Sequence, residues 1–189
     1  MDSHTTKTTG TVNVKTISMA GLMAAVICIL GPLSIPLPFS PVPISLTNFV
    51  IYFTIYIVGM KLGVVSYFIY LLIGLVGLPV FSGFSSGPVK LFGPTGGYLI
   101  GFIFMALICG IVIEKFENRY LFRFIGMVVG TVVCYAFGTA WLAYQAGMSF
   151  SAALAAGVIP FIPGDLVKIV LALIFGTQIR KSLKASHLV

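Results

Sequence analysis

Three charged residues stand within apolar parts of this 189-residue chain, and their types suit the binding of a small polar molecule. Lys90, Asp165 and Lys168 are these residues, in a sequence that is 8% charged and 59% hydrophobic. A charge at membrane depth is costly unless it is paired or faces a polar cavity. Asp165 and Lys168 are three residues apart, so on a helix they share a face. The three charges together predict a ligand site, although Asp165 alone could also be a helix cap.

The composition indicates an integral membrane protein, because a soluble domain cannot hide so much apolar surface. About 20 apolar residues are needed to cross the hydrocarbon core as a helix. Six segments approach this requirement: 16–31, 44–59, 62–77, 95–114, 121–146 and 161–180. We therefore expect an all-α, single-domain membrane protein with six transmembrane helices.

The distribution of Lys and Arg predicts the orientation of these helices. With a cytoplasmic N-terminus, the inner segments hold nearly all the basic residues, as the positive-inside rule requires. Both termini are then cytoplasmic, and the three charges of the predicted site lie toward the outer side of a multi-pass cell membrane protein. The expected boundaries are a tail at 1–15, the six-helix binding domain at 16–182 and a second tail at 183–189.

Two outer connections are predicted to shape the site. Residues 31–43 contain five prolines, which exclude a helix because proline lacks the backbone N–H. This segment is either an extended apolar cover over an outward-facing pocket or a plain connector. Residues 93–97, Gly-Pro-Thr-Gly-Gly, open the next helix. They form either an anion site made of free backbone amides, reinforced by Lys90, or a tight turn.

Several functions are disfavoured by what the sequence lacks. It has no Gly-x-x-x-x-Gly-Lys-Ser/Thr loop for ATP. Its two histidines lie in the tails, and its three cysteines lie in separate apolar segments, which favours packing over a disulfide or a metal site. The net charge of +7 marks topology and does not form a patch that would predict nucleic-acid binding. We expect no enzyme, no cofactor and no metal.

The order of the motifs resembles the BioY family, the biotin-specific S components of energy-coupling-factor (ECF) vitamin transporters. The matching stretches are 42–46, 74–81, 93–102 and 162–168. The runs Gly-Pro-Thr-Gly-Gly-Tyr and Pro-Gly-Asp-x-x-Lys are specific when they occur together. The resemblance implies six helices, a biotin pocket near the outer face, and partnership with a transmembrane coupling subunit and two cytoplasmic ATPases.

The resemblance also implies roles for individual residues. Asp165 would accept a hydrogen bond from the ureido ring of biotin, and Lys168 would donate to the ureido oxygen or hold Asp165 in place. Lys90 and the amides of Gly96 and Gly97 would take the carboxylate. An amide on the second helix and three aromatic rings would complete the pocket: Asn48, Phe39, Phe92 and Tyr98.

Ala20 and Ala24 match the Ala-x-x-x-Ala signature by which such subunits are thought to dock onto the coupling subunit. Small residues four apart also serve internal helix packing, so both interpretations stay open.

The main hypothesis is a high-affinity biotin-binding membrane subunit that depends on an ATP-driven partner. The alternative is a self-contained permease or channel for a small organic anion. That alternative requires polar residues along the whole path, and the inner halves of the predicted helices have few.

Overall fold

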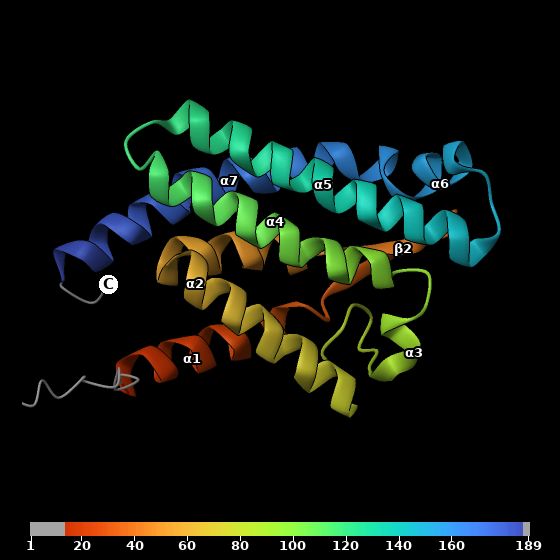
Figure 1. Ribbon diagram of the computed structural model, residues 1–189, viewed down its shortest axis with the longest axis horizontal. Coiled ribbons are helices and arrows are strands. Elements are labelled where there is room, and N and C mark those ends of the chain that lie inside the picture. Colours follow the sequence, from red (N-terminus) through yellow and green to blue (C-terminus); the bar gives the residue numbers. More distant parts are fainter. Residues whose placement is uncertain (1–13, 187–189) are drawn as a thin grey trace, which may run out of the picture.

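The structure is a computed structural model that describes residues 14–186, and it consists mainly of long helices. Figure 1 shows these helices side by side in one bundle, with the start of α1 and the end of α7 at the same end. The elements in chain order are α1 (Val14–Leu30), β1 (Ser34–Leu37), β2 (Ser40–Ser45), α2 (Thr47–Val76), α3 (Gly87–Leu91), α4 (Gly96–Lys115), α5 (Tyr120–Ala146), α6 (Phe150–Gly157), the 3-10 helix η1 (Ile159–Phe161) and α7 (Ile162–Ala185). Parts of the predicted tails, 1–13 and 187–189, lie outside the described residues.

Within the described part of the chain, four helical stretches are long and apolar enough to cross a membrane. They are Thr47–Val76, Gly96–Lys115, Tyr120–Ala146 and Phe150–Leu183, and α1 is a shorter apolar helix. The prediction of a largely helical membrane protein is thus confirmed.

Helix α2 reverses direction at Gly59, between the two segments that the sequence predicted as separate spans. Gly59 has φ 79° and ψ 177°, a backbone conformation that side chains other than glycine rarely adopt. The two halves of α2 fold back on each other from this point (Figure 1). Glu114 Oε1 accepts from the Met60 amide at 2.7 Å, and Arg180 Nη1 donates to the Tyr56 carbonyl at 3.4 Å. An anion at a helix start and a cation at a helix end both match the helix dipoles.

Helices α4 and α5 pack closely because glycines occupy their contact. A Cβ added at Gly101 would lie 2.9 Å from the Cys134 carbonyl oxygen, and one at Gly130 would lie 2.7 Å from Cys109 Sγ. Small residues at this contact therefore let the two helices approach closely, as expected for membrane helices.

The proline-rich connection forms a short β-hairpin. Strand β1 pairs antiparallel with β2, with Ser34 opposite Ser45 and an irregularity between Ile35 and Leu37. Prolines within both strands remove ladder donors, which explains the irregular pairing. The sequence predicted an extended segment and did not predict the pairing.

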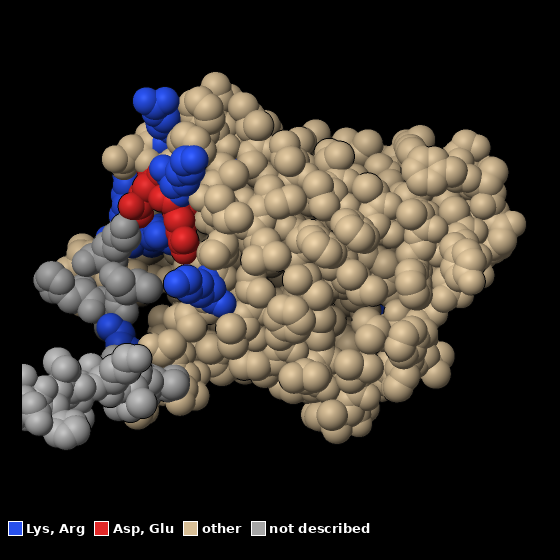
Figure 2. Space-filling model, in the orientation of Figure 1, with Lys and Arg blue, Asp and Glu red and all other residues tan. Residues whose placement is uncertain are grey.

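Charged side chains gather at the opposite end of the bundle from this hairpin, on the face that Figure 2 shows. This end holds the α4–α5 connection and the end of α7 (Figure 1). There, Arg180 Nε lies 2.9 Å from Glu117 Oε1. The bundle is therefore strongly asymmetric in charge from one end to the other.

Candidate ligand site

A cavity lies among β2, α2, α4, α5 and α7, near the end of the bundle that carries the hairpin. Polar side chains line it from four of these elements, among them Ser45, Asn48, Thr131, Tyr135, Asp165 and Lys168. The rest of the lining is largely apolar and aromatic, including Val42 and Pro43 of the hairpin. Apolar walls with a few convergent polar groups are typical of small-molecule sites.

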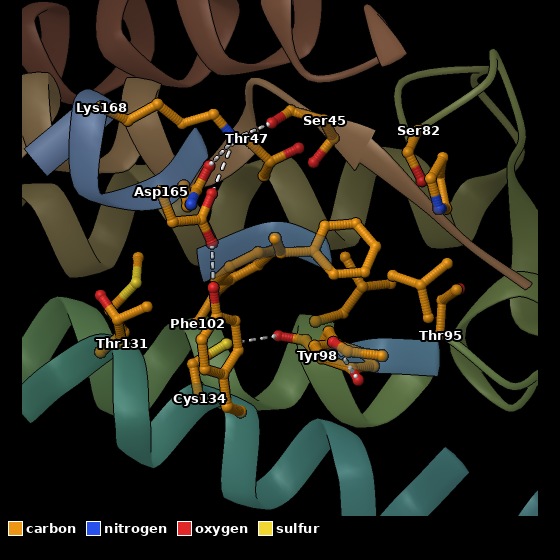
Figure 3. A pocket seen from close by; sticks show the side chains of 18 residues that line it. Ser45, Thr47, Ser82, Thr95, Tyr98, Phe102, Thr131, Cys134, Asp165 and Lys168 are labelled. Atoms are coloured by element: carbon orange, nitrogen blue, oxygen red, sulfur yellow. Dashed lines mark hydrogen bonds and ion pairs between the residues drawn. The ribbon is translucent and has the colours of Figure 1, made fainter. Parts of the chain in front are cut away.

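The ion pair predicted from sequence spacing forms the polar centre of this cavity. Lys168 Nζ lies 2.9 Å from Asp165 Oδ1, and Asp165 is only 7% exposed. The same Nζ donates to the Ser45 carbonyl at 2.7 Å and to Asn48 Oδ1 at 3.1 Å (Figure 3). An ammonium has three N–H donors, so all three donors of Lys168 are engaged.

Tyr135 supplies the second hydrogen bond to the carboxylate. Its Oη donates to Asp165 Oδ2 at 2.6 Å. Oδ1 therefore accepts from Lys168 of α7 and Oδ2 from Tyr135 of α5. The sequence interpretation missed Tyr135. A signal was present, since Thr131, Tyr135 and Thr139 carry hydroxyls four residues apart in an otherwise apolar helix, a spacing that puts them on one face.

Asp165 lies in the first turn of α7, where a helix cap was the alternative interpretation. Its hydrogen bonds within residues 14–186 run to the side chains of Lys168 and Tyr135. The carboxylate therefore faces the cavity and its neighbours in space. It still benefits from its place near a helix N-terminus, where a negative charge is favoured.

Tyr98 and Thr95 line the same cavity at the start of α4. Tyr98 Oη donates to the Gly157 carbonyl at 2.9 Å, which ties α4 to α6. Gly96 and Gly97 are buried beside them but do not line the cavity. The Gly96 amide donates to the Gly93 carbonyl at 2.9 Å, as in a tight turn.

Three other predicted contacts lie outside the cavity lining. Lys90 is half-buried on α3, and this burial lowers the pKa of its ammonium below the usual value because desolvation disfavours the charged form. Phe39 and Phe92 are 65% and 63% exposed. Their contacts with a ligand stay predictions.

Ala20 and Ala24 lie between α1 and α2, where they are 5% and 1% exposed. Ser66 Oγ of α2 donates to the Ala20 carbonyl at 3.0 Å. In this conformation the pair serves helix packing inside the chain, and its docking role stays a prediction.

A second, more apolar crevice lies between α5, α6 and α7. The volume of this crevice is about 370 Å³, and that of the first cavity is about 60 Å³. The two share Thr131, Tyr135 and Asp165 as a common wall. Polar convergence, rather than size, marks the first cavity as the candidate ligand site.

The fold defines a small helical membrane protein with a polar cavity near one end, and comparison with known proteins identifies its family. The model of the BioY family matches residues 4–185. The chain belongs to the BioY family.

Individual relatives are similar over nearly their whole length. The chain is 37% identical to the biotin transporter BioY of Thermotoga maritima over 162 residues, which cover 86% of this chain and 94% of that one. It is 32% identical to the biotin transporter BioY2 of Lactococcus lactis, over 90% and 93% of the two chains. These relatives are transporters and not enzymes.

A solved structure has the same fold. The crystal structure of the S-component for biotin from an ECF-type ABC transporter matches with a TM-score of 0.82 and 33% identity, over 89% of this chain and 92% of that one. The likeness thus extends to the arrangement of the helices.

Proposed function

We propose that this chain is the high-affinity biotin-binding S component of an ATP-driven ECF vitamin uptake transporter. The observation that carries the proposal is the buried Asp165–Lys168 pair inside a cavity of a BioY-family chain. Membership of a transporter family disfavours the alternative of a self-contained channel.

The lone pairs of the Asp165 carboxylate suit the ureido N–H donors of biotin. Lys168 and Tyr135 occupy one acceptor position on each oxygen, and an ionised carboxylate offers about four. Two therefore remain for ligand donors. Lys168, with all its donors engaged, is better placed to hold Asp165 than to bind the ureido oxygen directly. Asn48 helps to hold Lys168 in place, because its Oδ1 accepts a hydrogen bond from Lys168 Nζ.

We assign the carboxylate end of biotin to Lys90 and the start of α4, with Thr95 and Gly97 as further donors. The predicted Gly96 amide would first have to leave the Gly93 carbonyl to which it donates. A half-buried lysine attracts an anion more strongly than an exposed one, since water screens it less. Tyr98 would contact the ring system, and Phe39 and Phe92 would cover the ligand from the outer loops.

Energy must come from partners, because the chain has no phosphate-binding loop. We propose an ECF transmembrane coupling subunit and two cytoplasmic ATPases, with Ala20 and Ala24 of α1 as the docking segment. Since both alanines are buried against α2, docking through them would require α1 to shift.

We further propose six membrane spans with both termini cytoplasmic: α1, the two halves of α2, α4, α5 and α7. The gathering of charged residues at one end (Figure 2) supports this orientation. Cysteines introduced at the exposed Ser151 and Ser182 make a matched pair for its test. A membrane-impermeant maleimide should label the first in intact cells and the second only after permeabilisation, and the reverse pattern would overturn the orientation.

Calorimetric titration of biotin into the purified full-length chain tests the main proposal. We expect one-to-one binding with a Kd of about 1 nM to 100 nM, near −10 to −12 kcal/mol. A chain that elutes as a folded species and binds no biotin would overturn the proposal. Biotin flux into liposomes by the chain alone would revive the permease alternative.

A further inference from the structure

The polar centre of the cavity includes a residue from α5 that no sequence motif identified. Tyr135 donates to Asp165 Oδ2 at 2.6 Å, the shortest of the hydrogen bonds to this carboxylate. Hydrogen bonds from a hydroxyl to a charged carboxylate are strong, and they fix the direction of the acceptor. Asp165 is thus held from α5 through Oδ2 and from within α7 through Oδ1.

The place of Tyr135 in the fold gives this hydrogen bond a further role. Tyr135 and Asp165 belong to the wall shared by the ligand cavity and the apolar crevice between α5, α6 and α7. Without the Tyr135 hydroxyl, the carboxylate would be held by Lys168 alone and could turn toward Ser45 and Asn48. Its two free lone pairs would then no longer point toward an N–H donor of the ligand in the cavity.

We propose that Tyr135 is a positioning residue for ligand recognition: its hydroxyl orients the Asp165 carboxylate so that the remaining lone pairs face the ligand cavity. The inference rests on the proposed biotin function, and it adds a residue whose role is exerted through Asp165. Tyr135 needs no contact with the ligand for this role.

The first test is biotin titration of the full-length Tyr135→Phe variant, which removes one oxygen atom and keeps the ring. We expect affinity about tenfold to a hundredfold weaker than wild type, the usual effect of losing a hydrogen bond to a charged group. Tyr67→Phe is the control, because Tyr67 is also buried and is not among the residues that line the cavity. Its hydroxyl donates to the backbone carbonyl of Leu99 at 2.8 Å and has no contact with Asp165. This control should bind biotin as wild type does.

A double-mutant cycle tests whether Tyr135 acts through Asp165. In an Asp165→Asn background, Tyr135→Phe should weaken binding by less than about twofold, since the group that Tyr135 orients has been changed. Full additivity of the two losses would overturn the positioning role, and so would wild-type affinity of the single Tyr135→Phe variant.

Infrared spectroscopy supplies a readout that a general loss of stability would not produce. The chain has two aspartates, Asp2 and Asp165, so carboxyl-labelled aspartate in an Asp2→Asn chain reports on Asp165 alone. Its carboxylate stretching bands should shift in Tyr135→Phe and not in Tyr67→Phe. Unshifted bands would contradict the inference even if affinity fell.

The titrations distinguish failure of the inference from failure of the proposed function. If wild type binds no biotin, the proposed function is wrong. If wild type and Tyr135→Phe bind biotin equally well, only the inference about Tyr135 is wrong.

Discussion

Two buried charges, one near each end of the bundle, have contrasting surroundings. Asp165 is 7% exposed, and both of its oxygens accept hydrogen bonds. Arg123 is 1% exposed and donates from Nη1 to Thr177 Oγ1 at 3.1 Å, while its Nε and Nη2 have no hydrogen-bond partner among the described residues. The centre of its guanidinium lies 4.6 Å from the ring centroid of Tyr120 and 5.9 Å from that of Tyr56.

This difference in hydrogen-bond partners indicates different roles for Asp165 and Arg123. A guanidinium is delocalised and weakly hydrated, so aromatic faces can offset part of its burial. A carboxylate is strongly hydrated and needs directed donors. The fold supplies those donors from two helices and leaves lone pairs open toward a cavity. We therefore expect the two ends to respond differently to substitution, with binding sensitive at Asp165 and insensitive at Arg123.

The largest effect is expected for Asp165→Asn, which keeps the shape and removes the charge. Biotin affinity should fall about a hundredfold or more, because the ligand loses a charged acceptor and Lys168 keeps a buried charge without its anion. Calorimetry measures this loss, with size-exclusion chromatography as the check on folding. Wild-type affinity in a folded sample would move the site away from the ion pair.

Lys90→Ala should weaken biotin binding about tenfold through loss of a charge-assisted contact to the ligand carboxylate. Biotin methyl ester, which lacks this charge, should bind both proteins alike. Because burial lowers the pKa of Lys90, the cation is present at lower pH and is lost as pH rises through that pKa. The difference between wild type and Lys90→Ala should therefore shrink toward alkaline pH. Lys61→Ala, near the Gly59 reversal, is the control variant and should bind biotin as wild type does. If Lys90→Ala weakened binding of the methyl ester as much as binding of biotin, the assignment of Lys90 to the ligand carboxylate would be wrong.

Asn48→Ala removes one of the three acceptors around Lys168 and should weaken biotin binding about threefold to tenfold. This is less than the full effect of a hydrogen bond to a charged group, because Lys168 keeps its contacts with Ser45 and Asp165. Thr54→Val is a matched control on the same helix, because the buried Thr54 hydroxyl has no hydrogen-bond partner among the described residues. Equal losses in the two variants would show that disturbance of α2, rather than the contact with Lys168, causes the effect.

The smallest change is expected for Arg123→Met, which keeps much of the volume and removes the charge. Biotin affinity should stay within about twofold of wild type, and thermal stability should stay equal or rise, as for other buried charges replaced by apolar groups. Arg123→Ala should melt lower than Arg123→Met, because it leaves a cavity. A large loss of affinity in Arg123→Met would show that the two ends of the bundle are energetically coupled.

The sequence predicted the charged centre because the Asp165–Lys168 contact is local, three residues apart on one helix. It could not predict the partners from distant segments. Tyr135 lies 30 positions from Asp165 and Ser45 lies 123 positions from Lys168, so these contacts depend on how the helices pack. For the same reason the exposure of Phe39 and Phe92 could not be predicted. An aromatic residue in an outer loop gives the same sequence pattern whether its side chain faces the cavity or solvent.

The engaged donors of Lys168 have a consequence for the order of events during ligand entry. An acceptor atom that arrives at this ammonium cannot simply add to it, because Ser45, Asn48 and Asp165 already take its three N–H groups. Contact with Lys168 is therefore a partner exchange that leaves the number of hydrogen bonds nearly constant. If the carbonyl of Ser45 is the partner released, the end of β2 is unfastened from α7, and the same event that seats the ligand frees the strand beside the cavity.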